Sequence, residues 1–185
     1  MTVDFIMLRI AIYGSECTGK TTLAQYLADH YATLWVPEYS RDYAENKPLL
    51  DISDVMPIIR GQIAHEEEAV RVARKRGLPL VICDTIPLSS IAYSLYYNHA
   101  VLEEAKVLAK RPYDLYLLTD TDVPWQADGI RGQNVDRTTM HQLFCQQLLE
   151  NQLPYTLLTS IQAERFTMAT QTIDRQLQHK AHDSY

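Results

Sequence analysis

Short apolar runs alternate along the chain with longer segments in which apolar residues recur every three or four positions. The apolar runs predict strands at residues 5–13, 33–36, 80–84, 113–119 and 155–159. The longer segments predict helices at residues 20–31, 54–75, 88–97, 102–110, 139–151 and 161–179. Residues 38–44 are expected to be helical or looped. Strands that alternate with helices predict an α/β, three-layer sandwich with a central parallel sheet of about five strands.

The length and composition are those of one folded domain spanning residues 1–185. Of these 185 residues, 46% are hydrophobic and 22% are charged, which is enough apolar material for a core. The net charge of −6 argues against a nucleic-acid partner, because such proteins usually carry a basic surface. No apolar run is long enough to span a bilayer, and the first residues do not resemble a signal peptide. With three cysteines and no C-x-x-C pair, the sequence predicts a cytoplasmic protein without a membrane partner.

The segment from Gly14 to Thr21 has the spacing G-x-x-x-x-G-K-T and lies between a predicted strand and a predicted helix. This context is the one that a P-loop requires. The two glycines allow successive backbone N–H groups to point into one anion-binding concavity. Lys20 can reach the β- and γ-phosphates of a nucleotide, and the Thr21 hydroxyl can bind Mg²⁺. The predicted nucleotide-binding residues here are Gly14, Ser15, Glu16, Cys17, Thr18, Gly19, Lys20, Thr21 and Thr22.

Asp84 ends a continuous apolar run, at the edge of the sheet where α/β proteins bind ligands. In a P-loop enzyme, a carboxylate at this place can bind Mg²⁺ or accept a proton from the substrate. An aspartate at a strand end can instead cap the following helix, a role that Thr85 could share. We favour the functional role because the chain contains a P-loop.

Glu38 and Arg41 follow the second predicted strand and are three residues apart. If they begin a helix, they lie on one face, open to a substrate or to each other. The alternative is an ordinary surface ion pair, which is common and weak. Their place at the ligand edge of the sheet favours substrate binding by Glu38, Arg41 and Tyr39, whose ring could also stack on a base.

The polar segment at residues 120–138 has little periodicity and predicts a loop or lid. It contains Arg131 and Arg137, which could approach the γ-phosphate when a glycine-hinged lid closes. The alternative is a solvated loop in which these arginines pair with Asp128 and Asp136. Trp125 could stack on a base or anchor the lid to the core.

Taken together, these motifs resemble the nicotinamide riboside kinase domain of NadR-type proteins, over residues 9–178. The resemblance rests on G-S-E-C-T-G-K-T at 14–21, E-Y-S-R-D at 38–42, C-D-T at 83–85 and W-Q-A-D-G-I-R at 125–131, followed by Arg137. It implies a nucleoside-kinase-like P-loop NTPase fold with a small lid. It also implies ATP-dependent phosphorylation of the 5′-hydroxyl of N-ribosylnicotinamide, giving nicotinamide mononucleotide.

The resemblance further implies roles for individual residues. Lys20 and Thr21 would hold phosphates and Mg²⁺, and Asp84 would contact the metal or the attacking hydroxyl. Glu38 is the competing candidate for the base, and Arg131 and Arg137 would act from the lid.

Two departures from the family pattern are visible. Many members have an acid two residues after the strand-end aspartate, where this chain has Ile86, so any role of that acid is missing. The H-x-G-H motif of the larger NadR proteins is also missing, so we expect a kinase without the nucleotidyltransferase activity.

Three hypotheses stay open at this stage. The first is nicotinamide riboside kinase, and the second is another nucleoside or nucleotide kinase. The third is a P-loop regulator that binds nucleotide and signals to a partner. The sequence leaves open which nucleoside is accepted, whether GTP can replace ATP, which carboxylate is the base, and whether the chain forms a homo-oligomer.

Overall fold

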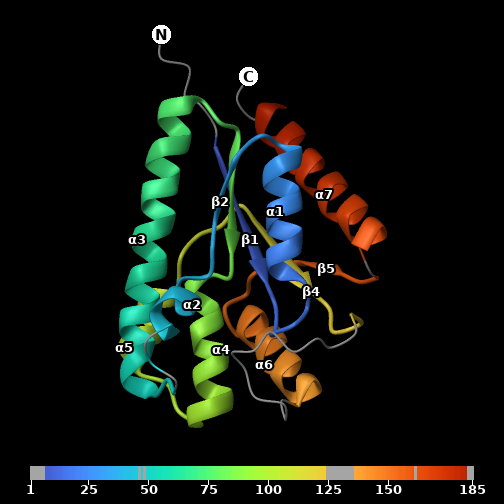
Figure 1. The fold of residues 1–185 in the computed structure, drawn as a ribbon. Helices are drawn as coiled ribbons and strands as arrows, with labels where there is room; N and C mark the ends of the chain where they lie inside the picture. Colours follow the sequence, from blue (N-terminus) through green and yellow to red (C-terminus); the bar gives the residue numbers. More distant parts are fainter. Residues whose placement is uncertain (1–6, 46, 48, 124–135, 161, 183–185) are drawn as a thin grey trace.

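A computed structural model describes residues 7–45, 47, 49–123, 136–160 and 162–182. Within these residues the chain forms a five-stranded, all-parallel sheet in the order β2-β3-β1-β4-β5 (Figure 1). The strands are β1 (Leu8–Tyr13), β2 (Leu34–Val36), β3 (Leu80–Asp84), β4 (Leu115–Thr119) and β5 (Thr156–Leu158). The predicted α/β sandwich with a central parallel sheet is therefore confirmed.

Helices cover both faces of this sheet. They are α1 (Lys20–His30), α2 (Tyr39–Ala44), α3 (Ile52–Arg76), α4 (Pro87–Asn98), α5 (Glu103–Ala109), α6 (Arg137–Glu150) and α7 (Gln162–His182). Helices α1 and α7 lie together on one face (Figure 1), and residues of α3, α4, α5 and α6 pack in the core on the other.

The alternation of side chains along each strand divides the apolar residues between two cores. In β1, Leu8, Ile10 and Ile12 face α1 and α7, whereas Ala11 and Tyr13 face the opposite core. All five of these side chains are fully buried. Strands buried on both faces appear in sequence as unbroken apolar runs, which is why the pattern predicted them well.

Two boundary predictions were wrong. Arg137 was expected in a loop but is the first residue of α6, capped by the Asp136 side chain, which accepts hydrogen bonds from the Thr138 and Thr139 N–H groups. The last helix was expected over residues 161–179 but continues to His182. Helix α3 is capped by Asp51, within a capping box with Asp54.

Because every strand is parallel, the carboxyl ends lie at one edge of the sheet. The P-loop follows β1 there, Asp84 ends β3 and Thr119 ends β4, while Glu38 lies two residues beyond β2. The fold thus brings the predicted site residues to the edge where α/β proteins bind ligands. No helix in the described part of the chain is long and apolar enough to cross a membrane.

Candidate active site

The P-loop is held against the end of β4. Gly14 has a φ of 144°, and a Cβ at this position would lie 2.3 Å from the Thr119 Oγ1 atom. Only glycine allows such a close approach. The Thr18 and Thr119 hydroxyl oxygens are 2.7 Å apart, and Thr119 Oγ1 also lies 3.3 Å from the Tyr13 carbonyl oxygen. These contacts join the loop to the ends of two strands.

Inside the loop, the Ser15 carbonyl organises the polar groups. It accepts a hydrogen bond from Thr18 Oγ1 at 2.8 Å and one from Lys20 Nζ at 2.7 Å. Lys20 is only 5% exposed, so its ammonium group is held within the concavity. This is where a cation would meet the phosphates of a nucleotide.

The other loop residues occupy different environments. Glu16 is buried and accepts a hydrogen bond from the Tyr97 hydroxyl of α4 at 3.3 Å. Cys17 has a left-handed φ of 54°, and Gly19 is the N-cap of α1 with a φ of 79°. Thr22, in the first turn of α1, is exposed.

Thr21 and Asp84 are 63 residues apart in sequence but in direct contact in the fold. The Thr21 hydroxyl donates to Asp84 Oδ2 at 2.7 Å. Asp84 is 1% exposed, and its Oδ1 atom is buried without a hydrogen-bond partner in the described structure. Asp84 does not cap α4, because the N-cap of that helix is Ile86 and no side chain caps it. The pair therefore presents one unsatisfied carboxylate oxygen beside the P-loop.

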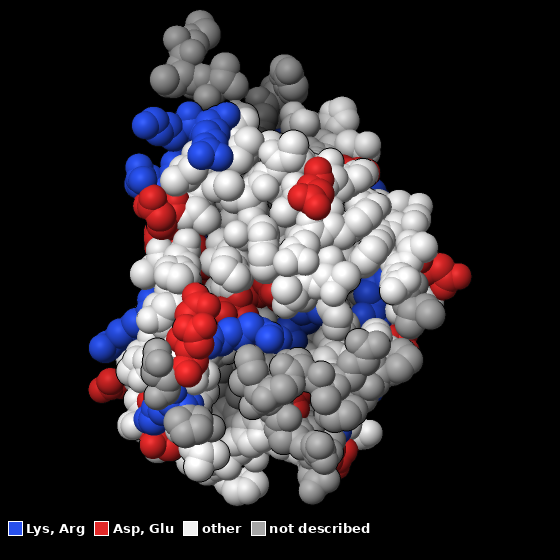
Figure 2. Space-filling view, in the orientation of Figure 1, with Lys and Arg blue, Asp and Glu red and all other residues white. Residues whose placement is uncertain are grey.

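Burial raises the pKa of Asp84 above its ordinary value. The positive charges of Lys20 and Arg41 and the hydrogen bond from Thr21 act in the opposite direction, whereas Glu38 adds to the increase. These charges are thus close enough to influence one another. Figure 2 shows basic and acidic side chains meeting in a hollow across the middle of this face, below α1.

Glu38 is the N-cap residue of α2 and is 3% exposed. Its two carboxylate oxygens accept hydrogen bonds from Ser40 Oγ at 2.7 Å and from Arg41 Nε at 3.1 Å. The pairing of Glu38 with Arg41 was one of the two outcomes foreseen, but the deep burial of Glu38 distinguishes it from a surface ion pair. The Tyr39 ring packs against α3, with its edge toward His65 at a centroid distance of 5.0 Å.

Of the two predicted lid arginines, the structure describes Arg137. Arg131 and Trp125 lie outside the described residues, as does most of the predicted lid. Arg137 donates from Nη1 to the Val123 carbonyl at 2.9 Å rather than to the P-loop. Its Nε and Nη2 atoms are buried and have no partner among the described residues.

The sequence pattern did not mark two residues that contact the P-loop: Thr119, described above, and Arg165. Arg165 of α7 is 2% exposed and donates from Nη1 to the Thr18 carbonyl at 2.6 Å. Its Nη2 atom contacts Asp122 and the Asp120 carbonyl, just beyond β4. Burial lowers the pKa of Arg165, whereas Asp122 and Asp120 act to raise it. A single arginine 147 residues away thus supports the loop, and no local pattern marks it.

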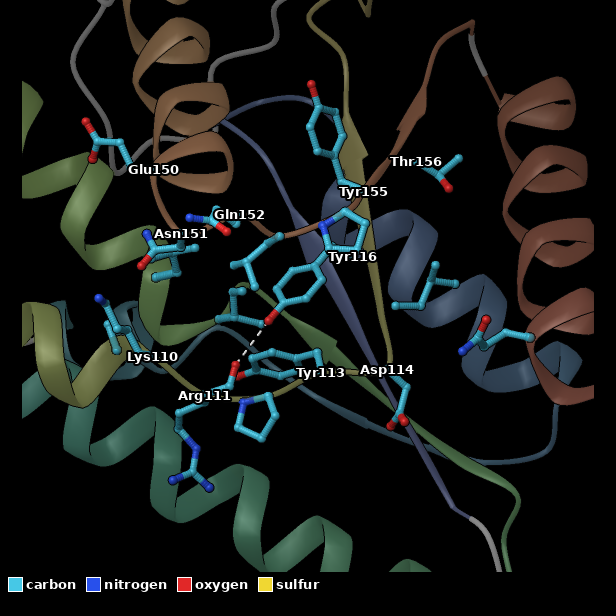
Figure 3. Close-up of a pocket in the computed structure, with 18 residues that line it drawn as sticks. Lys110, Arg111, Tyr113, Asp114, Tyr116, Glu150, Asn151, Gln152, Tyr155 and Thr156 are labelled. Atoms are coloured by element: carbon cyan, nitrogen blue, oxygen red, sulfur yellow. Dashed lines mark hydrogen bonds between the residues drawn. The ribbon is translucent and has the colours of Figure 1, made fainter. Parts of the chain in front are cut away.

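A separate pocket of about 850 Å³ lies near the amino ends of β4 and β5, at the opposite edge of the sheet (Figure 3). Tyr113, Tyr116 and the segment 151–155 line it, and the Tyr116 hydroxyl donates to the Arg111 carbonyl. None of the predicted phosphate- or substrate-binding residues lines this pocket. The chemistry of the P-loop therefore lies elsewhere.

A buried phosphate loop between the first strand and the first helix of a parallel sheet is the defining feature of P-loop nucleotide-binding proteins, and this chain has it. The chain belongs to the AAA domain family, whose sequence profile matches residues 9–165.

Two curated relatives share the same name, trifunctional NAD biosynthesis/regulator protein NadR, and come from Salmonella typhimurium and Escherichia coli. Each is 30% identical to this chain over 165 residues, which cover 82% of this chain and 38% of the relative. The resemblance to NadR-type proteins is thus confirmed, although the chain matches well under half the length of these relatives.

Solved structures show the same fold. A NadR protein in complex with NR superposes with a TM-score of 0.77 at 22% identity, covering 93% of this chain and 52% of that one. NadR in complex with NAD and AMP-PNP gives a TM-score of 0.74 at 22% identity, covering 93% of this chain and 50% of that one. Thymidylate kinase from Ehrlichia chaffeensis gives 0.61 at 17% identity, covering 92% and 98%. The predicted nucleoside- or nucleotide-kinase-like P-loop fold is therefore confirmed.

Proposed function

We propose that this chain is an ATP-dependent kinase that phosphorylates the 5′-hydroxyl of nicotinamide riboside, giving nicotinamide mononucleotide and ADP. The observation that carries the proposal is the hydrogen bond from Thr21 to the buried Asp84, with the buried Glu38 close enough to help raise the pKa of Asp84. We assign the phosphates to the P-loop and the hydroxyl of the substrate to these carboxylates. The similarity to NadR, one structure of which is in complex with NR, supports the choice of nucleoside.

In the proposed reaction, the 5′-oxygen forms a bond to the γ-phosphorus while the bond between that phosphorus and the β–γ bridging oxygen breaks. The leaving electron pair stays on ADP, and the 5′-hydroxyl proton passes to a carboxylate. Lys20 and the backbone N–H groups of the P-loop stabilise the charge on the phosphoryl oxygens. Because little covalent chemistry falls to the protein, alignment of the two substrates accounts for most of the catalysis.

Asp84 and Glu38 are the two candidates for proton acceptor. Asp84 has a buried oxygen without a partner and a raised pKa, whereas each oxygen of Glu38 already accepts a hydrogen bond. This contrast favours Asp84 as the base and Glu38, held by Arg41, as a group that binds the ribose. Tyr39 belongs to the same substrate-binding segment.

Mg²⁺ fits the residues present. Mg²⁺ prefers oxygen ligands and usually binds through one or two protein groups plus phosphates and water. The Thr21 hydroxyl is such a group, and the unpartnered Oδ1 atom of Asp84 is another if it binds the ion instead of accepting the 5′-hydroxyl proton. When bound with the nucleotide, the ion would neutralise charge on the β- and γ-phosphates. Arg137, with two unpartnered guanidinium nitrogens, and Arg131 are proposed to bind phosphate as well.

The test is release of ADP by the purified protein with ATP and Mg²⁺, across a panel of nucleosides and nucleotides. We expect turnover with nicotinamide riboside and little with the others. Turnover only with another nucleoside would refute nicotinamide riboside as the substrate but would still support the assignment as a kinase. No turnover on the panel, with ATP still bound, would instead support a regulatory P-loop protein.

A second candidate is another nucleoside or nucleotide kinase. The observation that favours it is the likeness to thymidylate kinase, which covers nearly the full length of both chains. The panel separates the two candidates when thymidine and its monophosphate are included.

We also expect the chain to work as one domain in the cytoplasm, with a small-molecule nucleoside as its partner and no nucleic acid. Gel filtration with light scattering would decide whether it forms a homo-oligomer.

A further inference from the structure

The segment that carries Glu38 is attached to α3 by two buried polar side chains. Asp54 accepts a hydrogen bond from the Tyr43 hydroxyl at 2.9 Å, and Gln62 lies nearer to Glu38. Gln62 of α3 is 3% exposed, and its Oε1 atom accepts a hydrogen bond from the Tyr39 backbone N–H at 2.9 Å. That N–H belongs to the peptide group that joins Glu38 to Tyr39. A hydrogen bond to it therefore fixes the peptide plane next to the Glu38 side chain.

The Tyr39 ring makes a further contact with α3. A Cβ added at Gly61 would lie 2.0 Å from Tyr39 Cε1 and 2.3 Å from Cζ, so the ring lies directly on the helix backbone. Helix α2 has only six residues and no buried side chains. Because so short a helix is not stable by itself, its contacts with α3 must hold it in place.

The orientation of the Gln62 amide is set from inside the core. Since the Tyr39 N–H can only donate, the Gln62 oxygen must face it, and the amide NH₂ group then faces Glu66. Gln62 Nε2 donates to Glu66 Oε1 at 3.3 Å, and the Tyr113 hydroxyl donates to Glu66 Oε2 at 2.7 Å. Glu66 is fully buried. A Gln62 amide turned the other way would place its oxygen against a carboxylate and two N–H groups against each other.

We propose that Gln62 is a positioning residue for the nucleoside-binding segment Glu38–Arg41, and that the buried Glu66 holds Gln62 in the orientation this requires. The inference rests on the proposed function, because it assigns the nucleoside to this segment. Gln62 is almost fully buried, so we assign its effect to the backbone of Tyr39 and, through it, to the side chain of Glu38.

The test is the variant Gln62→Met, which keeps the length of the side chain and removes the acceptor for the Tyr39 N–H. We expect KM for nicotinamide riboside to rise roughly tenfold, as for the loss of one buried hydrogen bond and a misplaced binding group, with KM for ATP within about twofold. Hydrogen exchange of the Tyr39 amide should accelerate by about the same factor.

The matched control is Gln147→Met on α6. Gln147 is also a buried glutamine (5% exposed) that donates to a nearby glutamate, Glu150, at 3.2 Å, but it is far along the chain from α2. We expect it to leave both KM values and the Tyr39 exchange rate unchanged. An equal rise of the two KM values in Gln62→Met would indicate a general structural defect and would overturn the proposal.

A second variant, Gly61→Ala, keeps every hydrogen-bonding group and favours the helix, but it displaces the Tyr39 ring. It should raise KM for the nucleoside as Gln62→Met does. Unchanged exchange at Tyr39 in Gln62→Met overturns the positioning role whether or not the enzyme is active. If the wild-type protein is inactive on nicotinamide riboside, the assigned nucleoside is refuted. Faster exchange of the Tyr39 amide in Gln62→Met would still support the role of Gln62 in anchoring α2.

Discussion

The two halves of the candidate site are built in different ways. The phosphate half is one continuous segment, Gly14–Thr21, whose groups bond mainly to one another and to the adjacent strand ends. The proposed nucleoside half, around Glu38 and Arg41, lies at the start of a six-residue helix that α3 holds through Asp54, Gly61 and Gln62. The phosphate half is therefore rigid by local construction, whereas the nucleoside half depends on packing. Damage to the first should impair catalysis, and damage to the second should impair substrate affinity.

The largest effect is expected from Lys20→Met, at the centre of the phosphate half. Loss of this buried ammonium removes charge stabilisation from the transferred phosphoryl group, so kcat should fall roughly a thousandfold. Steady-state ADP release measures it. Lys106→Met is the control, because Lys106 is exposed and pairs only with Glu103 in the described structure. A fall in kcat of less than tenfold in Lys20→Met would contradict the assignment of Lys20 to phosphate binding.

The next largest effects are expected from Asp84→Asn and Glu38→Gln. The two variants should differ, because one tests the proton acceptor and the other tests nucleoside binding. A base must be ionised, so kcat/KM should fall as pH drops through the raised pKa of Asp84. We expect Asp84→Asn to lower kcat by roughly a hundred- to a thousandfold and to remove this acidic limb. Glu38→Gln should keep the limb and mainly raise KM for the nucleoside. Loss of the limb in Glu38→Gln alone would make Glu38 the base.

Arg165→Met tests whether the conformation of the phosphate half depends on a side chain that is distant in sequence. Its removal leaves the Thr18 carbonyl and Asp122 without their cation, which should destabilise the fold by about 2–4 kcal/mol. KM for ATP should rise by roughly tenfold, with a smaller change for the nucleoside. Chemical denaturation and substrate titrations measure the two effects. Arg71→Met is the control, since the exposed Arg71–Glu68 pair contributes little.

The smallest effect concerns stability and involves Glu66, behind the nucleoside half. Burial raises the pKa of Glu66 from 4.5 to about 7, with Arg9 and Arg111 opposing the increase. Between these pH values the folded protein binds a proton that the unfolded chain does not. Stability should therefore increase as pH falls from 8 to 5, by about 1–3 kcal/mol.

Denaturant unfolding at several pH values would measure this increase, with Glu66→Gln as the comparison. The variant should lose the contribution of Glu66 but keep any from Asp84, whose pKa is also raised. Parallel profiles for the two proteins would show that Glu66 does not titrate in this range.

Much of the molecule could be predicted because its signals are local. Strands such as β3 are continuous apolar runs bounded by Gly77, Pro79 and Asp84, and the P-loop is defined by spacing within eight positions. Helix ends were less certain, as Arg137 illustrates, because a side-chain cap such as Asp136 can start a helix within a polar segment.

By itself, the sequence determined the order of strands and helices along the chain. It also determined the phosphate loop and the residues that reach the ligand edge of the sheet. Only the tertiary structure decided which of these residues meet. Thr21 reaches Asp84 across 63 positions, Gln62 reaches Tyr39 across 23, and Arg165 reaches Thr18 across 147. The physical reason is that backbone conformation follows from neighbouring residues, whereas a hydrogen bond between distant segments depends on strand register and helix packing. The residues that flank an isolated arginine or glutamine in the sequence do not predict its partner in the fold.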